Sequence, residues 1–180
     1  MFAKLQELDI VNFSPGEKNE INSEQAKRVA KAVKAIIAAA EELQSLFIQD
    51  IPNIDYYDYN TDAVRLTMRH LIPFDGIIRI QKLTLRSVRV RRKALVHFFD
   101  VRSKNLVAVS FWHVISEDAT WAAILDDMRA LEWPHLQQFG MYCCHDPETI
   151  ASEFMGDIVQ DYLLHKTDKN PTMVLEEDQA

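Results

Sequence analysis

Three features of the sequence predict an α+β protein: a long amphipathic helix pattern near the N-terminus, a central stretch in which apolar and polar residues alternate, and two helix patterns toward the C-terminus. Helices and strands separated along the chain in this way are typical of helices packed on one face of an antiparallel sheet. We therefore expect a long N-terminal helix, an antiparallel three- or four-stranded meander, and two C-terminal helices with one candidate short strand between them.

The length of the chain, 180 residues, fits a single domain. We assign this domain to residues 1–166. The last residues, 167–180, are polar and acidic, and we expect them to form a mostly disordered tail. No internal repeat or low-complexity block is recognised in the sequence.

The long N-terminal helix is predicted to begin at Asn22 or Ser23, because Asn22 and Gln25 have the spacing of a capping box. Apolar residues then recur every three or four positions until Pro52. This heptad-like stripe fits a helix that lies on a sheet, which we favour, and also fits a dimer seam. Its members are Val29, Val33, Ile36, Ala40, Leu43 and Phe47.

The strands are predicted from a period of two between Ile77 and Ile115. The clearest strands are residues 94–101 and 106–115, and the polar residues 102–105 are expected to join them as a hairpin. Residues 63–72, which precede this region, fit either a helix or a strand.

The C-terminal helices are predicted from their capping residues. Ser116 is expected to cap a helix over residues 117–132, and Asp146 is expected to cap the last helix. Residues 139–144 form the candidate strand between them. The expected buried faces are Trp121, Ile124, Leu125, Met128 and Leu131 in the first helix, and Ile150, Phe154, Ile158, Tyr162 and Leu163 in the second.

Glycine and cysteine usage excludes several classes of protein. The four glycines lie far apart, so the chain has no Gly-rich phosphate loop and no dinucleotide-binding turn, and we expect no cofactor. No apolar run approaches the roughly 20 residues that span a bilayer, so we expect no membrane partner. Because Cys143 and Cys144 are adjacent, they cannot crosslink distant segments, which favours a cytoplasmic protein with reduced thiols.

The charge is distributed unevenly along the chain. The net charge is −7, yet residues 77–104 hold nine basic residues and one acid. Arginines at two-residue spacing on one strand face would follow the oxyanions of a nucleic acid or of an acidic protein surface. The alternative is an edge strand that its cations protect from aggregation. The predicted polyanion-binding residues are Arg79, Arg86, Arg89, Arg91, Arg92, Lys93 and Arg102.

An acidic, tyrosine-rich segment at residues 50–62 is a candidate partner-docking loop. It would dock a basic partner or fold over the basic strands of its own chain or of a second copy. The alternative is a solvated surface loop with partly packed tyrosines. Its candidate contact residues are Asp55, Tyr56, Tyr57, Asp58 and Tyr59.

Two smaller features are weaker candidates for function. Cys143, Cys144 and His145 combine thiol and imidazole groups and are candidate thiol-chemistry or metal-binding residues, although a buried small hydrophobic cysteine is the favoured interpretation. Trp112 and His113 are adjacent in a predicted strand, so they cannot both face the core, and one of them marks a candidate binding surface.

These observations lead to three functional hypotheses. The first is a non-enzymatic binding or regulatory protein that engages a polyanionic partner, nucleic acid or acidic protein, through a basic sheet face. The second is a homodimeric interaction module, such as an adaptor, chaperone or immunity-type protein, that dimerises through the long helix or an edge strand. The third, a minority hypothesis, is an enzyme that uses the Cys143–His145 cluster for thiol or metal chemistry.

Overall fold

The computed structural model describes residues 2–13, 23–51, 67–73, 79–147, 152–154 and 156–172. Strands and helices alternate along these residues. The elements are β1 (Glu7–Phe13), α1 (Ser23–Ala39), β2 (Ser45–Ile51), α2 (Met68–Leu71), β3 (Lys82–Arg86), β4 (Arg89–Val90), α3 (Arg92–Arg102), β5 (Ala108–Trp112), β6 (Ile115–Ser116), α4 (Trp121–Arg129), β7 (Gln138–Cys144), β8 (Ser152–Phe154) and α5 (Gly156–Leu163).

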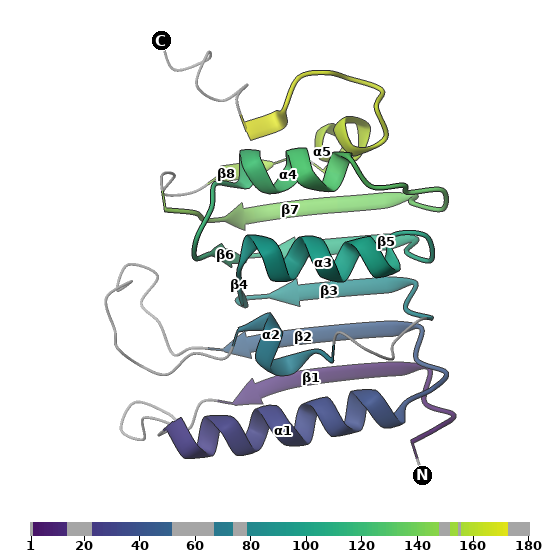
Figure 1. The fold of residues 1–180 in the computed structure, drawn as a ribbon, viewed down its shortest axis with the longest axis vertical. Helices are drawn as coiled ribbons and strands as arrows, with labels where there is room; N and C mark the ends of the chain where they lie inside the picture. The colour runs from purple at the N-terminus through teal and green to yellow at the C-terminus, as the bar shows by residue number, and fades with distance from the viewer. Residues whose placement is uncertain are drawn as a thin grey trace.

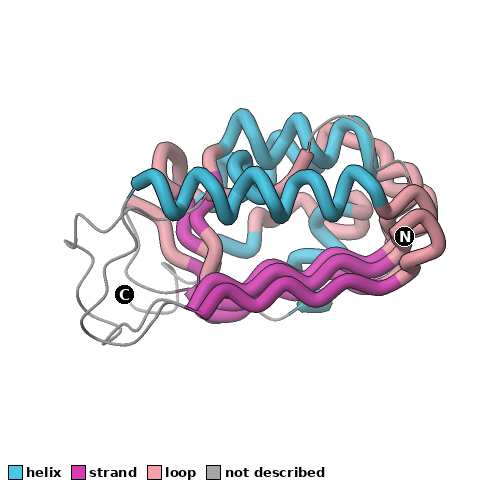
Figure 2. The backbone as a smooth tube through the Cα atoms, turned by 90° about the horizontal axis from the view of Figure 1, so that it is seen from below, coloured by secondary structure: helices cyan, strands magenta, loops and turns pink. Residues whose placement is uncertain are grey.

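The main sheet has the strand order β1-β2-β3-β5-β7-β8, so each strand pairs with the next one along the chain. The first five of these strands are parallel, and β8 is antiparallel at the edge. The helices α1 to α4 all lie on one face of this sheet (Figures 1 and 2). None of the described helices is long and apolar enough to cross a membrane.

The molecule is an α/β solenoid, in which strand–helix units stack side by side. Neighbouring strands lie about 4.8 Å apart, whereas packed helices need about 8–10 Å. One helix for each strand therefore favours a curved stack with the strands on its inner side. Figure 1 shows this difference, since α1 to α4 spread over a greater height than the strands that they connect.

The predicted α+β fold with an antiparallel meander is wrong. Residues 94–101, predicted as a strand, belong to α3, and residues 102–105 form the turn after that helix instead of a hairpin. The reason is that apolar residues are so frequent here that both periods fit. Leu95, Phe98 and Phe99 have helical spacing and are fully buried. A helix at this position is favoured over a strand because β3 and β5 are parallel, and a parallel pair needs a crossover connection, which is usually a helix.

The predicted long N-terminal helix is also wrong in extent. α1 begins at Ser23, as expected, but ends at Ala39, and residues 45–51 form strand β2. In β2, Leu46 and Ile48 are buried, while Phe47 lies on the other face of the sheet. The spacing of apolar residues by three and four positions thus continues by coincidence from α1 across the turn into β2. Of residues 63–72, the described part contains α2, which settles the earlier ambiguity there as a helix.

The next helix was predicted more accurately. α4 begins at Trp121, and its cap is Thr120, whose hydroxyl accepts a hydrogen bond from the Ala123 amide. The predicted cap, Ser116, lies in β6 instead. The candidate strand at residues 139–144 is confirmed as β7. Trp121, Ile124, Leu125 and Met128 are all buried, as predicted.

The last helix starts later than predicted. α5 begins at Gly156, and the Asp146 carboxylate accepts a hydrogen bond from the Trp121 amide at the start of α4. Ile158 is 46% exposed, whereas Val159, Tyr162 and Leu163 are buried. Residue Ile150 lies outside the described residues, and Phe154 belongs to β8.

Part of the predicted disordered tail is packed against α4. Asn170 is buried, and its amide donates to the Ala122 carbonyl and to the Asp126 carboxylate. The Tyr162 hydroxyl of α5 also donates to Asp126, and the Arg129 guanidinium lies 4.5 Å from the Tyr162 ring. These contacts close the β7 end of the solenoid. Residues 173–180 of the predicted tail lie outside the described residues.

A structural repeat that the sequence did not reveal organises residues 83–145. Leu83, Val109 and Phe139 occupy one register position in neighbouring strands, at separations of 26 and 30 residues. Four residues after each of these positions, at the C-terminal end of the strand, is a residue in the left-handed backbone region. These residues are Ser87, His113 and Cys143, with φ of 54°, 53° and 48°. None of them is glycine, so the conformation is held by the strand pairing around it.

This shared turn gives a first prediction. At φ of 54°, Ser87→Val places a β-branched side chain in a region that such residues rarely adopt, so it should destabilise the fold by about 1–2 kcal/mol. Ser87→Gly should be neutral or stabilising at the same position, because glycine adopts positive φ without that cost. Urea unfolding measures both. Equal destabilisation by glycine and valine would contradict the left-handed turn.

Candidate binding site on the open sheet face

The sheet face that points away from α1 to α4, here called the open face, carries three rows of side chains. The rows arise because the parallel strands are in register. The first row is Glu7, Ser45, Lys82, Ala108 and Gln138; the second is Asp9, Phe47, Thr84, Ser110 and Gly140; the third is Val11, Gln49, Arg86, Trp112 and Tyr142.

Two aromatic side chains stand next to each other in the third row. The rings of Trp112 and Tyr142 are stacked, with centroids 4.2 Å apart and planes 20° from parallel. They are 39% and 38% exposed, respectively. The Trp112 indole Nε1 donates a hydrogen bond of 2.9 Å to the Ser110 hydroxyl, which fixes the orientation of the ring. The result is an exposed but ordered aromatic surface.

Gly140 leaves room for the Tyr142 ring to lie against the backbone of its own strand. A Cβ atom at position 140 would lie 3.1 Å from the Tyr142 Cε2 atom, closer than an ordinary contact. Because glycine has no side chain, the Tyr142 ring covers the backbone of its own strand and buries Gly140. This close approach is a reason for glycine here, independent of backbone angles.

A cation completes the third row beside the aromatic pair. Arg86 is exposed and occupies the register position next to Trp112. His113 directly follows Trp112 in the chain. The pKa of His113 is lowered from its ordinary value, mainly by burial and to a smaller extent by electrostatic interaction with His145 and Arg86. His113 is therefore neutral at pH 7, and Arg86 supplies the positive charge at this point. Lys82, also exposed, lies on the same face of β3.

Most of the other predicted polyanion-binding residues lie elsewhere. Lys93 is exposed on α3, on the helix side of the sheet, and Arg79 is exposed just before β3. Arg102 is 1% exposed, with its guanidinium 4.5 Å from the Phe98 ring and donating to the Phe98 and Pro73 carbonyls. The structure therefore does not gather the seven predicted cations on one face.

Three of the predicted cations pair with acids of the next repeat. Arg89 and Arg91 both contact Glu117, at 3.8 and 2.8 Å. Arg92 contacts Asp127 through two parallel hydrogen bonds of 2.7 and 2.8 Å. These ion pairs join the β4–α3 segment to the β6–α4 segment. The high positive charge of residues 77–104 is thus partly balanced within the protein.

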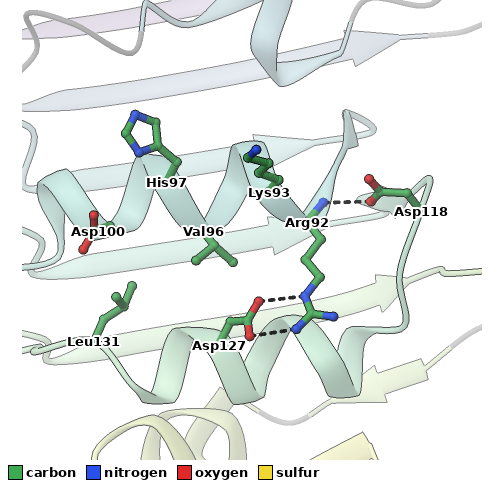
Figure 3. Close-up of a pocket in the computed structure, with 8 residues that line it drawn as sticks. All are labelled: Arg92, Lys93, Val96, His97, Asp100, Asp118, Asp127 and Leu131. Carbon is green, nitrogen blue, oxygen red and sulfur yellow. Dashed lines mark hydrogen bonds and ion pairs between the residues drawn. The ribbon is translucent and has the colours of Figure 1, made fainter.

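Arg92 and Asp127 line a groove of about 520 Å³ between α3 and α4 (Figure 3). His97 and Asp100 also line it, so they lie on the same side of their helix. The strand that we predicted for residues 94–101 would have placed His97 and Asp100 on opposite faces. The Arg92–Asp127 ion pair spans this groove and thereby links α3 to α4.

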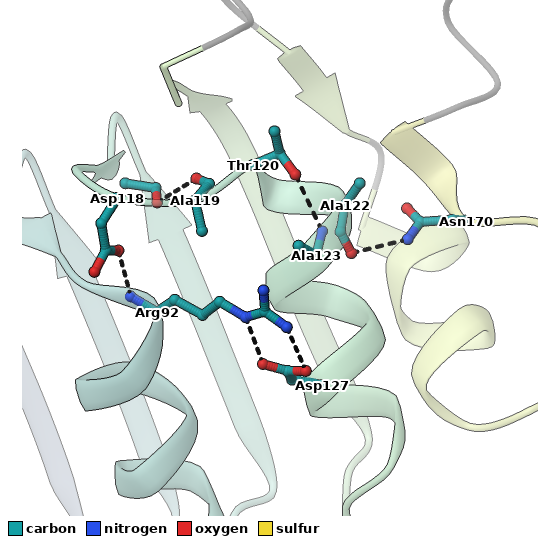
Figure 4. A network of polar contacts seen from close by, with 9 residues as sticks. Arg92, Asp118, Ala119, Thr120, Ala122, Ala123, Asp127 and Asn170 are labelled. Carbon is teal, nitrogen blue, oxygen red and sulfur yellow. Dashed lines mark hydrogen bonds and ion pairs between the residues drawn. The ribbon is translucent and has the colours of Figure 1, made fainter.

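Capping contacts at the ends of the helices extend this polar network (Figure 4). The Asp118 carboxylate accepts a 2.8 Å hydrogen bond from the Arg92 amide at the start of α3. Thr120 caps α4, and Asn170 binds the Ala122 carbonyl. Because acids favour helix N-termini, Asp118 is placed where it stabilises α3 and is not a free carboxylate.

The two thiols of the cysteine–histidine cluster lie in different surroundings. Cys144 is fully buried, and burial raises the pKa of its thiol to about 12. Cys143 is half-buried and has a left-handed backbone conformation near the end of β7. The His145 carbonyl accepts a hydrogen bond from the Trp121 indole. No group of three metal-ligating side chains is found among the described residues.

The predicted partner-docking loop, with Asp55, Tyr56, Tyr57, Asp58 and Tyr59, lies outside the described residues. Sequence reasoning pointed to Trp112 but missed Tyr142 and Gly140. The signal that would have found them is the repeat itself, because aligning residues 83–87 with 109–113 and 139–143 places Arg86, Trp112 and Tyr142 at one position.

The fold and this surface define an α/β solenoid protein whose sheet presents aromatic and charged side chains on the face away from its helices. The sequence matches no family model. Comparison with curated proteins and with solved structures also gives no match. What the open face binds is therefore inferred from its own residues.

The thiol environments predict selective alkylation. In the native protein at about pH 8, iodoacetamide should modify Cys143 and leave Cys144 unmodified, because Cys144 is buried and its thiol stays protonated. The variant Cys143→Ser should take up label only after unfolding in urea, as measured by mass spectrometry. Rapid native labelling of that variant would overturn the assignment of Cys144 as an inert core residue.

The Arg92–Asp127 pair predicts a pH-dependent contribution to stability. The hydrogen bond from Arg92 holds the pKa of Asp127 below its ordinary value. Its contribution is therefore present above about pH 4 and lost as the pH falls through the folded-state pKa. Asp127→Asn should cost about 1 kcal/mol or less at pH 7, because both side chains are partly exposed, and less still in acid.

Urea unfolding at several pH values tests this expectation. Asp100→Asn is the matched control, since Asp100 is an exposed carboxylate on the same groove. A cost for Asp127→Asn that does not change with pH would show that the charge of Asp127 is not what stabilises the helix pair.

Proposed function

We propose that the protein is a non-enzymatic binding protein that docks an acidic segment of another protein on its open face. The observation that carries this proposal is the exposed row of Arg86, Trp112 and Tyr142. Tryptophan, tyrosine and arginine are the residues most enriched among the few that dominate the energy of protein–protein interfaces. Here the three come from successive strands, so the parallel register holds them side by side.

The fixed orientation of the two aromatic rings supports a binding role. A stacked pair whose indole is already hydrogen-bonded loses little side-chain freedom when a partner covers it. The curvature of the solenoid supports the same role, since solenoid proteins commonly bind partners on the extended inner surface. An apolar or aromatic side chain of the partner would pack on Trp112 and Tyr142.

The charges of the open face favour an acidic segment. Arg86 lies next to the aromatic pair and Lys82 lies four residues away on the same face of β3; both are exposed and would pair with carboxylates of the partner. Glu7 and Asp9 on β1 repel acids at the far end, which limits the extent of the contact. Of these two cations, Arg86 was among the seven predicted polyanion-binding residues and Lys82 was not.

Protein is favoured over nucleic acid as the partner. The net charge of −7 opposes the general attraction to phosphates on which nucleic-acid affinity depends, and two cations would release few counterions. We place the interaction in the cytoplasm, because the adjacent cysteines Cys143 and Cys144 cannot crosslink distant segments, which fits a reducing compartment.

A peptide-display selection tests the proposal. Random peptides are selected on the full chain after depletion on the double variant Arg86→Glu/Trp112→Ala. Enriched peptides should combine an acidic residue with an aromatic or large aliphatic one. Their affinity should fall about thirtyfold with Trp112→Ala, which corresponds to about 2 kcal/mol for a dominant interface residue.

Lys93→Glu is the matched control, since it makes the same charge reversal on an exposed residue of the helix side. Affinity should be unchanged in this control. Peptides that bind the double variant as tightly as the unmodified chain would refute the proposal. Retention on single-stranded DNA that depends on Arg86 and Trp112 would replace the protein partner with nucleic acid.

A further inference from the structure

The two ends of the solenoid differ. At the β7 end, β8 and α5 cover the last parallel strand. At the β1 end, no described strand pairs with the outer edge of β1. Leu8 and Ile10 point toward the core but remain half-buried, whereas Leu46 and Ile48 at the same register positions of β2 are 1% exposed.

The helix at this end carries an apolar flank. The core side of α1 is formed by Ala30, Val33 and Ile37. The residues that immediately precede positions 30, 33, 37 and 40 lie about 100° round the helix from that side. All four are apolar and at least partly exposed: Val29, Ala32, Ile36 and Ala39. The residues on the opposite flank include Lys27, Lys31 and Lys34.

The apolar flank faces the open end of the molecule. α1 runs antiparallel to β1 in front of the sheet, at the β1 end of the stack (Figures 1 and 2). In a right-handed helix with this direction, the flank that precedes the core residues turns away from α2, and the lysine flank turns toward it and toward solvent. An unpaired strand edge and an apolar helix flank therefore lie together.

We propose that a second copy of this chain covers this end, by antiparallel pairing of β1 with its own copy and by side-by-side packing of the two α1 helices. This inference is independent of the proposed function of the open face. A lone extended peptide would satisfy the edge of β1 but leave the flank of α1 exposed. A second copy supplies both a strand and a helix in the same arrangement.

The pattern of residues is self-complementary about a two-fold axis. An axis through Ile10, the middle residue of β1, places Asp9 opposite Val11 of the second copy, so that acids do not face each other across the new strand pair. On the antiparallel helices, Val29 meets Ala39 and Ala32 meets Ile36, so each larger side chain packs against a small one.

Charges at the ends of the helices support the same pairing. In this arrangement the exposed Arg28 near the start of one helix approaches the exposed Glu41 that follows the end of the other. The two helix dipoles are antiparallel, which is favourable. The strands then form one continuous sheet across the axis. Both open faces lie on the same side of that sheet, so the dimer presents two copies of the Trp112–Tyr142 pair.

Sedimentation velocity of the full chain tests the proposal. The protein should sediment as a dimer at high micromolar concentration and dissociate on dilution. The variant Ala32→Lys/Ala39→Lys should be monomeric, because each new cation would then be buried against an apolar side chain, Ile36 or Val29, of the second copy. Lysine is a good helix former, so both exposed sites should tolerate it.

Ala38→Lys is the matched control, since residue 38 is exposed on the lysine flank of the same helix, and it should remain dimeric. Amide exchange of residues 7–13 should slow on going from monomer to dimer, because the outer edge of β1 becomes hydrogen-bonded. A chain that stays monomeric at high concentration, or a double variant that dimerises as well as the control, would overturn the proposal. Trp112→Ala should leave the dimer intact, which separates this result from a failure of the open-face proposal.

Discussion

The in-register parallel pairing of β1, β2, β3, β5 and β7 is the constraint on which the rest of the structure depends. It requires a crossover between every two strands, and these crossovers place α1 to α4 on one face. It buries one set of alternating side chains under the helices and presents the other set as rows on the open face. The curvature, the core and the candidate binding surface all follow from this pairing.

The core explains why the pairing is held so firmly between β3 and β7. Phe111 lies between Phe99, Trp121 and Phe139, with ring centroids 5.6–6.2 Å apart. Rings at these separations gain favourable edge-to-face or tilted contacts in addition to burying large apolar areas. Because each ring comes from a different element, the cluster joins two helices to two strands. A slip in register would turn these side chains to the open face.

The cations divide into two groups with different tasks. Arg89, Arg91 and Arg92 pair with acids of the following repeat and tie neighbouring units together on the helix side. Lys82 and Arg86 are exposed on the other side of the sheet, where we propose that they contact a partner. A local charge count cannot distinguish these tasks, since the assignment depends on which acids the fold brings near.

The amino-acid pattern alone was sufficient to predict an element where the apolar residues of a segment fit a single helical or strand period. The buried face of α4 was predicted because its apolar residues follow a helical period, although its cap is Thr120 and not Ser116. The strand at β7 was predicted as a candidate short strand. The pattern also predicted that one of Trp112 and His113 faces away from the core, without deciding which. The tertiary structure decided the rest. Residues 94–101 and 45–51 contain enough apolar side chains to suit either helix or strand, and only the pairing of distant strands selects one. The meeting of Arg86, Trp112 and Tyr142 is also a tertiary result, since residues 26 and 30 positions apart become neighbours only when the strands stack in register.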